Sequence, residues 1–600
     1  MENAFETALG LYRAGRGAEA VAMLRALADH RPGEPAVLNL LGVCLHAAGQ
    51  TDEAGTALRA ALALAPDHAE ALLNLAALRN GAGRRSAAAA CLRRLLVLDP
   101  GLRDGLRLLG ATLSEMGDLD GAEAVLRRVA RLVPDGIEER FNLAATLCQT
   151  GAPDRAIRAL RQAIALRPEG AFAYGLLGAC CLRAGDLDAA EAAYARALRL
   201  DPAAADARHG RVRVARYRAT ARAARSGAGP DGLALRGAFA TASGYSHMAR
   251  RLIEALRRRR IPLEILGLLA DERWPFEPLD RPVRARALLN VLIPMAVERV
   301  PGLPTVTFTM FEGHPIPPSW LVHSRSSDVV VVPTRASRRA WIARGFPEAR
   351  LRLCPLGIDP ESGDGAPLHL TLPDGRPVAE IPYRFLNVSD FIPRKNVDGL
   401  LRVWLRATDR RDPACLILKL AIGGRPHGRT ELADLVRRGE AATGRRLAQA
   451  APILLVDAVL DEARMNGLYR AATHYWSLSH GEGWDLPMAT AGALGLGLIA
   501  PRHTAYLDYL HDGIAHLIPA GTAPATRPYE DEPWAPFHGL DWWQPDEEAA
   551  VAALQAVIRK GAALPSAADH LRRHFTWDQS AATLLTILGG LGLAPRPEGA

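Results

Sequence analysis

One acidic residue lies where a ligand could approach the backbone closely. Glu482 sits in the turn Gly481-Glu482-Gly483, after an apolar strand pattern and before a small-residue run that begins Leu486-Pro487. Proline is favoured in the first turn of a helix, so a helix N-terminus is expected beside Glu482. Its free N–H groups and the positive end of its dipole favour anions, and the glycines add no Cβ to block one. The segment predicts an anion-binding turn that carries an acid.

Two cations precede a second predicted helix, which starts at Val397. Arg394 and Lys395 are followed by Asn396, and lysine is rare in this chain, recurring only at Lys419 and Lys560. Cations are unfavourable at the positive end of a helix dipole unless an anion lies there too. Arginine offers a planar fork and lysine a compact charge, which are complementary ways to neutralise phosphate oxygens. The alternative is a solvated pair of charges at a helix start.

Alternating strand and helix patterns surround these residues and predict a parallel sheet. Strand patterns are expected at residues 233–239, 263–268, 305–311, 328–334, 383–388, 416–422 and 452–456, and helix patterns at 247–258, 460–472, 547–558 and 580–588. Glu312 and His314 follow one of these strands, and functional groups of open α/β sheets gather at the carboxyl ends of strands. Glu312 is therefore a candidate functional residue, with a turn-capping role as the alternative.

The run from Ser479 to Ala491 resembles the signature of retaining, nucleotide-sugar-dependent glycosyltransferases of family four, which have the GT-B fold. The shared residues are Ser479, Glu482, Gly483, Trp484, Leu486, Pro487 and Ala491. Asp485 stands where relatives have glycine, Thr490 where they have a second glutamate, and Asp390 where many have arginine. The segments 328–334 and 355–359 are also similar to strands of the family's first domain, so the resemblance covers roughly residues 233–588.

The resemblance implies a metal-independent, hexosyltransferase-type enzyme that moves a sugar from a nucleoside-diphosphate sugar to a protein or glycan acceptor with retention. The nucleotide sugar is a co-substrate, and no cofactor is expected. The implied catalytic residues are Glu482, Arg394 and Lys395, and the implied acceptor residues are Glu312 and His314. Donor binding would fall to Gly244, Ser389, Asn396, Gly483, Trp484, Leu486, Pro487 and Thr490. The alternative is a degenerate, glycosyltransferase-like scaffold that binds partners without turnover, motivated by Thr490, Asp390 and Asp485.

The first two hundred residues repeat with a period of 34. The columns are Pro32, Pro66, Pro100, Pro134, Pro168 and Pro202; Gly15, Gly49, Gly83, Gly117, Gly151 and Gly185; and Ala20, Ala54, Ala88, Ala122, Ala156 and Ala190. Period and residue types resemble six tetratricopeptide repeats. Such a solenoid presents a concave face suited to a peptide or helix, so it is expected to recruit an acceptor or partner. A spacer or dimerisation arm is the alternative. Asn74 and Asn142 share one repeat position, but Leu40, Leu108 and Leu176 interrupt that ladder.

These patterns predict a multidomain chain in which an all-α solenoid precedes an α/β unit. The expected divisions are repeats at 1–203, a capping helix and linker at 204–232, a first Rossmann-like (acceptor) domain at 233–380, a second (donor-binding) domain at 381–565, and closing helices and tail at 566–600.

Composition sets the remaining expectations. A formal charge of +8 permits anionic partners without selecting one, and no basic stripe interleaved with aromatics points to nucleic acid. Arg257-Arg258-Arg259-Arg260 allows peripheral membrane contact, although helix-end solvation is the simpler interpretation. The seven cysteines lack metal-ligand spacing and are expected to be buried thiols. No apolar run is long enough to span a bilayer and no secretory segment opens the chain, so a cytoplasmic location is expected.

Overall fold

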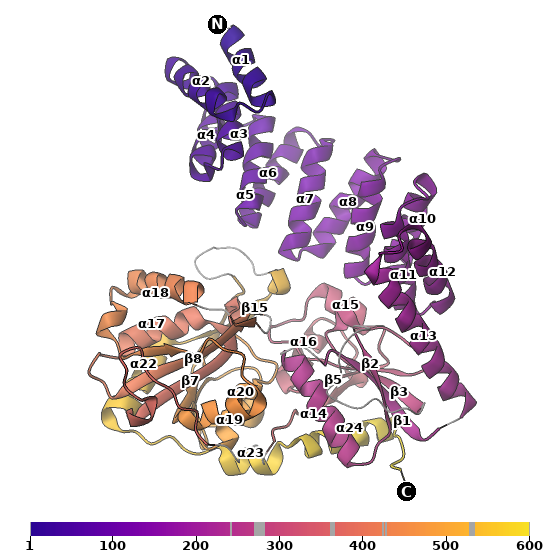
Figure 1. The fold of residues 1–600 in the computed structure, drawn as a ribbon, viewed down its shortest axis with the longest axis vertical. Coiled ribbons are helices and arrows are strands. Elements are labelled where there is room, and N and C mark those ends of the chain that lie inside the picture. The colour runs from indigo at the N-terminus through magenta and orange to yellow at the C-terminus, as the bar shows by residue number, and fades with distance from the viewer. Residues whose placement is uncertain are drawn as a thin grey trace. The chain divides into compact units, whose positions relative to one another are not determined.

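Figure 1 shows the fold of the computed structural model, which describes residues 2–227, 229–239, 243–268, 283–359, 366–422, 425–426, 429–526 and 535–598. The chain forms two compact units, the first mainly Met1–Leu177 and the second mainly Gly178–Pro528 and Gly539–Ala600. Residue 228 of the predicted linker lies outside the described residues. Each unit is taken by itself below, and the five predicted domain boundaries stay predictions.

The first part of the chain consists of paired helices. They are α1 (Glu2–Arg13), α2 (Gly17–His30), α3 (Pro35–Ala47), α4 (Thr51–Leu64), α5 (Ala69–Gly81), α6 (Arg85–Leu98), α7 (Arg103–Met116), α8 (Leu119–Leu132), α9 (Ile137–Gln149), α10 (Pro153–Leu166), α11 (Ala171–Ala184) and α12 (Leu187–Leu200). The glycine column supplies the turn within each pair, with positive φ from 76° at Gly15 to 84° at Gly117. All six alanines of the alanine column are fully buried. The predicted all-helical repeat region is confirmed.

Some helices of the array approach each other so closely that only glycine fits at the point of contact. A Cβ added at Gly110 would lie 2.7 Å from the side chain of Leu126, and one at Gly178 would lie 2.7 Å from the ring of Tyr194. The same ring lies 2.3 Å from the Cβ position of Gly210, on α13 (Ala205–Ser226). Glycine therefore lets two helices approach a large side chain from opposite sides.

Helix α13 ends the helical region and packs on β3 of the following sheet. The contact is built on one buried acid, Glu298, and three residues that pair with it. Arg213 Nη1 lies 2.9 Å and Arg236 Nη2 3.2 Å from its carboxylate, and the Tyr217 hydroxyl donates to it at 2.5 Å. The predicted capping helix is therefore fixed to the α/β region by a buried charge cluster, called the Glu298 cluster below.

The first sheet is parallel and has the order β2-β1-β3-β4-β5-β6. Its strands are β1 (Asp231–Gly237), β2 (Leu263–Gly267), β3 (Arg284–Val291), β4 (Thr305–Phe308), β5 (Val329–Val332) and β6 (Leu351–Leu353). Helices α14 (Gly244–Arg258), α15 (Pro318–Ser324) and α16 (Arg335–Ala343) connect them. The sequence patterns do not predict β3, because a short apolar run such as Ala287–Val291 fits a helix or a buried strand equally well.

The second sheet has the order β10-β8-β7-β11-β12-β13 and is parallel along this path, while β9 (Arg425–Pro426) pairs antiparallel with β8. Its strands are β7 (Tyr383–Asp390), β8 (Ala414–Ile422), β10 (Ile453–Leu455), β11 (His474–Trp476), β12 (Gly497–Pro501) and β13 (His516–Ile518). The helices are α17 (Val397–Ala407), α18 (Arg429–Thr443), α19 (Glu462–Ala471), α20 (Leu486–Ala493), α21 (Tyr506–Tyr509) and α22 (Glu547–Lys560). Two parallel sheets thus follow the helical region, as predicted.

The last helices, α23 (Ala568–His574) and α24 (Trp577–Gly590), return to elements far back in the sequence. α24 packs on α14 of the first sheet, and α23 packs on α20 of the second. Segment 541–545, which precedes α22, forms β15 and pairs antiparallel with β14 (Ala520–Pro524). The end of the chain therefore contacts helices of both sheet regions.

Two of the seven cysteines differ from the prediction. Cys44, Cys91, Cys181, Cys354 and Cys415 are free and buried, as expected. Cys148 and Cys180 are disulfide-bonded, so the prediction of seven thiols is wrong for these two. Cys148 lies on α9 and Cys180 on α11, and their spacing along the chain did not indicate that they are disulfide-bonded. Within the described ranges, no helix combines the length and the hydropathy needed to cross a bilayer.

Candidate functional site

The predicted catalytic residues meet where the strand order of the second sheet reverses. β7 lies between β8 and β11, so the chain runs outward on one side through β8 and β10 and then on the other through β11, β12 and β13. In open α/β sheets, ligands bind outside the carboxyl ends of the strands at such a reversal. Arg394 and Lys395 follow β7, and Glu482 follows β11. Topology therefore places all three at one edge.

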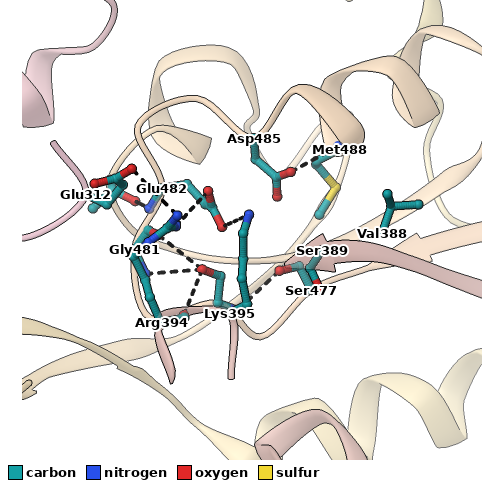
Figure 2. A network of polar contacts seen from close by, with 12 residues as sticks. Glu312, Val388, Ser389, Arg394, Lys395, Ser477, Gly481, Glu482, Asp485 and Met488 are labelled. Carbon is teal, nitrogen blue, oxygen red and sulfur yellow. Dashed lines mark hydrogen bonds and ion pairs between the residues drawn. The ribbon is translucent and has the colours of Figure 1, made fainter. Parts of the chain in front are cut away.

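The Glu482 carboxylate is held between the two cations (Figure 2). Its Oε1 lies 2.7 Å from Lys395 Nζ, and its Oε2 lies 3.0 Å from Arg394 Nη1. Glu482 is 4% exposed and Arg394 9%. Buried charges persist only when they are paired, so the three side chains form one mutually dependent group.

Backbone contacts hold the two loops together. The Arg394 carbonyl accepts hydrogen bonds from the backbone N–H of His480 at 2.8 Å and the Ser479 hydroxyl at 3.1 Å. Arg394 also donates to the Gly481 carbonyl. Asn396, in the left-handed conformation with φ of 50°, caps α17 by accepting from Gly399 N–H at 3.0 Å. Its amide donates to the Leu478 carbonyl at 2.9 Å. Asn396, predicted to bind donor, thus has a structural task in this loop.

The first sheet region contributes a third acid. Glu312, which follows β4, lies 3.6 Å from Arg394 Nη2. A Cβ on Gly481 would lie 1.9 Å from the Glu312 carbonyl oxygen, and one on Gly483 2.6 Å from the Met310 side chain. The two glycines of the turn are therefore needed for the close approach of this segment. Tyr245 fixes the same segment, because its hydroxyl accepts from Met310 N–H at 3.1 Å.

Asp485 occupies the N-terminal end of α20, where the sequence predicts an anion. It adopts the left-handed conformation, with φ of 66°, and its Oδ1 accepts from Met488 N–H at 3.3 Å (Figure 2). Its Oδ2 accepts from the Tyr506 hydroxyl at 2.7 Å. Leu486 and Pro487 form the first turn of α20, as predicted. The helix terminus beside Glu482 is thus already capped by a carboxylate of the chain itself.

The surrounding charges move the acids in opposite directions. Burial opposes ionisation of Glu482, but Lys395 and Arg394 outweigh it and lower its pKa to about 2. Burial and the neighbouring Glu482 raise the pKa of Asp485 to about 6. Burial also raises the pKa of Glu312. Attraction to Arg394 opposes this rise, and repulsion by Glu482 adds to it. Three acids share two cations here, so the two acids that lie farther from the cations than Glu482 bind protons more tightly.

Three residues that the sequence did not single out complete the turn. His503 Nε2 lies 2.8 Å from the Ser479 carbonyl, and its Nδ1 lies 2.8 Å from the Thr504 hydroxyl. That hydroxyl accepts from Glu482 N–H at 3.1 Å, with Thr504 at a positive φ of 41°. His480 Nδ1 contacts the Trp543 carbonyl at 2.8 Å and stacks on Trp542. Burial lowers the pKa of His480 to about 4 and of His503 to about 3, so both stay neutral.

The remaining predicted residues differ in how close they come to this group. Ser389 is the second-last residue of β7, and its hydroxyl donates to Asn387 at 2.8 Å. Thr490 is half-buried on α20, and Gly244 starts α14 with its Cβ position open. Residues 241 and 242 of the predicted loop before it lie outside the described residues, as do 423 and 424 after β8. The His314 side chain is exposed, and its backbone pairs with Asp541, so it does not join Glu312 at Arg394.

Two buried polar atoms beside the turn lack hydrogen-bond partners among the residues described. They are Trp484 Nε1 and the Tyr509 hydroxyl, whose rings pack with centroids 5.0 Å apart. Buried donors of this kind are ordinarily satisfied by water or a ligand. A search of the described residues for three or more His, Cys, Asp or Glu side chains that could hold a metal ion finds none.

Comparison with known proteins identifies the repeats. A tetratricopeptide-repeat family model matches residues 5–69 and 141–205, and a second one matches residues 45–101. No curated protein matches the chain. The N-terminal region is therefore built of tetratricopeptide repeats, which suggest protein–protein interaction.

Several solved structures are similar to a part of this chain. YrrB, described as a tetratricopeptide-repeat protein with an unusual peptide-binding site, is 18% identical over 31% of this chain and 96% of its own, with a TM-score of 0.30. pilF of Pseudomonas aeruginosa is 19% identical over 34% and 94%, with a TM-score of 0.30. MamA of Desulfovibrio magneticus RS-1 is 20% identical over 28% and 94%, with a TM-score of 0.27.

Proposed function

We propose that the chain is a GT-B-type glycosyltransferase that moves a sugar from a nucleoside-diphosphate sugar to a protein or glycan acceptor with retention. The observation that carries this proposal is the meeting of Glu482, Arg394 and Lys395 at the strand-order reversal of the second sheet, with Glu312 reaching Arg394 from the first. Groups from two parallel sheets that converge on one point fit a reaction between two substrates.

The chemistry needs a stabilised leaving group. As the sugar gains positive character, the departing diphosphate gains charge, and fixed cations lower the energy of that state. Arg394 and Lys395 are held for this role by Glu482 and by the loop contacts of Arg394. Glu482 orients the donor, Glu312 faces the acceptor, and the repeat array recruits an acceptor or partner protein.

Release of nucleoside diphosphate from a panel of nucleotide sugars tests this proposal. Lys395→Ala and Glu482→Gln are expected to reduce turnover by about 10²–10³-fold, which is the usual effect of removing one group that stabilises transition-state charge. Lys560→Ala is the matched control, because this exposed lysine at the end of α22 lies outside the group. Equal turnover in wild type and Lys395→Ala would refute the proposal.

A scaffold without turnover is the second candidate, and one observation favours it. Both oxygens of Glu482 are occupied by the cations that a diphosphate needs, and Asp485 caps the helix end that would receive it. Tight binding of nucleotide sugar in isothermal titration, with no nucleoside diphosphate released in the presence of cell extract as acceptor source, would favour the scaffold.

A further inference from the structure

The N-terminal end of α20 holds a carboxylate where the proposed donor's diphosphate must lie. Asp485 accepts from Met488 N–H, one of the free N–H groups of the first helical turn. It is 7% exposed, so solvent screens its charge poorly. Glycine would adopt its φ of 66° with less strain, but it would leave this end of the helix without a charge. The side chain therefore replaces an anion that the helix would otherwise attract.

Charge balance in the group shows what this carboxylate does. Two cations, Arg394 and Lys395, face three acids, Glu482, Glu312 and Asp485. With every group ionised, 2 positive charges meet 3 negative ones, which leaves 1 negative charge. An entering diphosphate would meet net repulsion rather than attraction. Loss of the Asp485 charge brings the group to neutrality and removes this net repulsion.

We propose that Asp485 sets the affinity of this site for anions: ionised, it weakens binding of a diphosphate at the end of α20, and once protonated or replaced by a neutral residue, it no longer opposes that binding. This inference rests on the proposed donor site and adds a specificity-determining residue to it. The geometry that carries it is the pair of hydrogen bonds from Met488 N–H and the Tyr506 hydroxyl to the two oxygens of a single carboxylate.

The pH range of this effect follows from the groups that face Asp485. Its pKa is raised to about 6, first by burial and then by Glu482. Between pH 5 and 8 the histidines of the turn stay neutral, because burial lowers their pKa values to about 4 and 3. Burial raises the pKa of each facing tyrosine, so these stay neutral too. The facing groups are Glu482, Arg394, Lys395, Tyr469, Tyr475, Tyr506 and Tyr509.

Binding of inorganic pyrophosphate to the full chain, measured by isothermal titration at pH 5 and pH 8, tests the proposal. Asp485→Asn keeps the shape of the side chain and tolerates the left-handed conformation. It is expected to bind about tenfold more tightly than wild type at pH 8, since one like charge is removed at close range. At pH 5 the two are expected to agree within about twofold. The ratio of the affinities of the variant and the wild type is compared at each pH. Protonation of pyrophosphate and, to first order, of Glu312 affects both proteins equally and drops out of this ratio.

Two further variants complete the design. Asp485→Gly, which suits the backbone conformation, is expected to bind tightly at both pH values and replaces Asp485→Asn if that variant folds poorly. Asp186→Asn makes the same change at the exposed N-cap of α12 and is expected to leave binding unchanged. Equal affinity of Asp485→Asn and wild type at pH 8, or absence of pyrophosphate binding in both, would overturn the inference.

This measurement separates the inference from the proposed function. If Asp485→Asn binds no tighter than wild type while wild type transfers sugar, the inference fails and the transferase stands. If pyrophosphate binding shifts as expected but no nucleotide sugar is turned over, the site selects anions by charge and the transferase fails.

Discussion

Two buried glutamates in this protein sit among cations but in opposite charge surroundings. Glu298 pairs with Arg213 and Arg236 where α13 meets the first sheet, and Glu482 pairs with Arg394 and Lys395 at the edge of the second. In both, burial opposes ionisation and the cations outweigh it, so both pKa values are lowered. The difference lies in their neighbours.

The Glu298 cluster has an excess of cations. Arg183 acts on the same acid as Arg213 and Arg236, and the Tyr217 hydroxyl donates to it. Around Glu482 the excess is of acids, because Glu312 and Asp485 compete for the same two cations. A lone acid among cations keeps its charge and its partners, which suits a structural contact. Surplus acids near cations retain protons and can exchange partners. That contrast agrees with the binding role proposed for the second group and with the structural role of the first.

The largest effect is expected for Glu298→Ala. Removal of the only acid leaves buried arginines without a counter-charge, which should lower the free energy of unfolding by about 3–5 kcal/mol. Urea denaturation followed by tryptophan fluorescence measures this loss. Nucleotide-sugar turnover per folded molecule should be unchanged. A loss below about 1 kcal/mol would show that α13 does not depend on this charge pairing.

Tyr217→Phe is expected to have a smaller effect in the same cluster. The hydroxyl donates to the charged carboxylate at 2.5 Å, and hydrogen bonds to charged groups contribute about 1.5–3 kcal/mol. The ring itself, 2% exposed, keeps its packing in phenylalanine. The same denaturation assay applies, with Tyr245→Phe as a hydroxyl deletion elsewhere in the α/β unit. An unchanged midpoint for Tyr217→Phe would mean that the arginines alone hold Glu298.

Asp485→Asn is expected to increase stability, and only at higher pH. The folded state raises the pKa of this acid from 3.8 to about 6, so between these values it binds more protons than the unfolded state. Wild-type stability therefore falls as pH rises through this window, while the amide pays no such cost. The variant should match wild type near pH 4 and exceed it by about 1–3 kcal/mol above pH 6. A gap independent of pH would contradict this assignment of the charge.

The smallest stability effect, about 1–2 kcal/mol, is expected for Glu482→Ala. Glu312 already lies 3.6 Å from Arg394, and removal of Glu482 relieves the repulsion on both remaining acids. The cost should thus be nearer to that of a lost hydrogen-bonding partner than to that of an orphaned charge. Urea denaturation of Glu482→Ala and Glu298→Ala in parallel tests this prediction. Equal losses of unfolding free energy in the two variants would contradict the contrast between the two groups.

The helical array could be predicted because its information is local and repeated. Each glycine with positive φ and each buried alanine recurs every 34 residues, so one repeat explains the others. Sequence reasoning on the α/β region predicted many of the strands but missed β3, β6, β9, β13 and the β14–β15 pair. The reason is that β15 is stabilised by a partner distant in sequence rather than by its own pattern. The disulfide-bonded state of Cys148 and Cys180 likewise depends on tertiary structure rather than on a local sequence pattern.

For the candidate site, residue types alone placed Arg394, Lys395 and Glu482 near helix starts, because helix dipoles and cations follow rules readable from sequence. Which of them touch was decided only by tertiary contacts between loops 87 residues apart. The cap of α20 is local, because Asp485 accepts from Met488 N–H three residues further on. Those contacts bury the charges, and burial makes the balance of acids and cations decisive. Sequence determined the repeating helices, the two sheets and the charged loops, while the folded chain decided which charges share one dry environment.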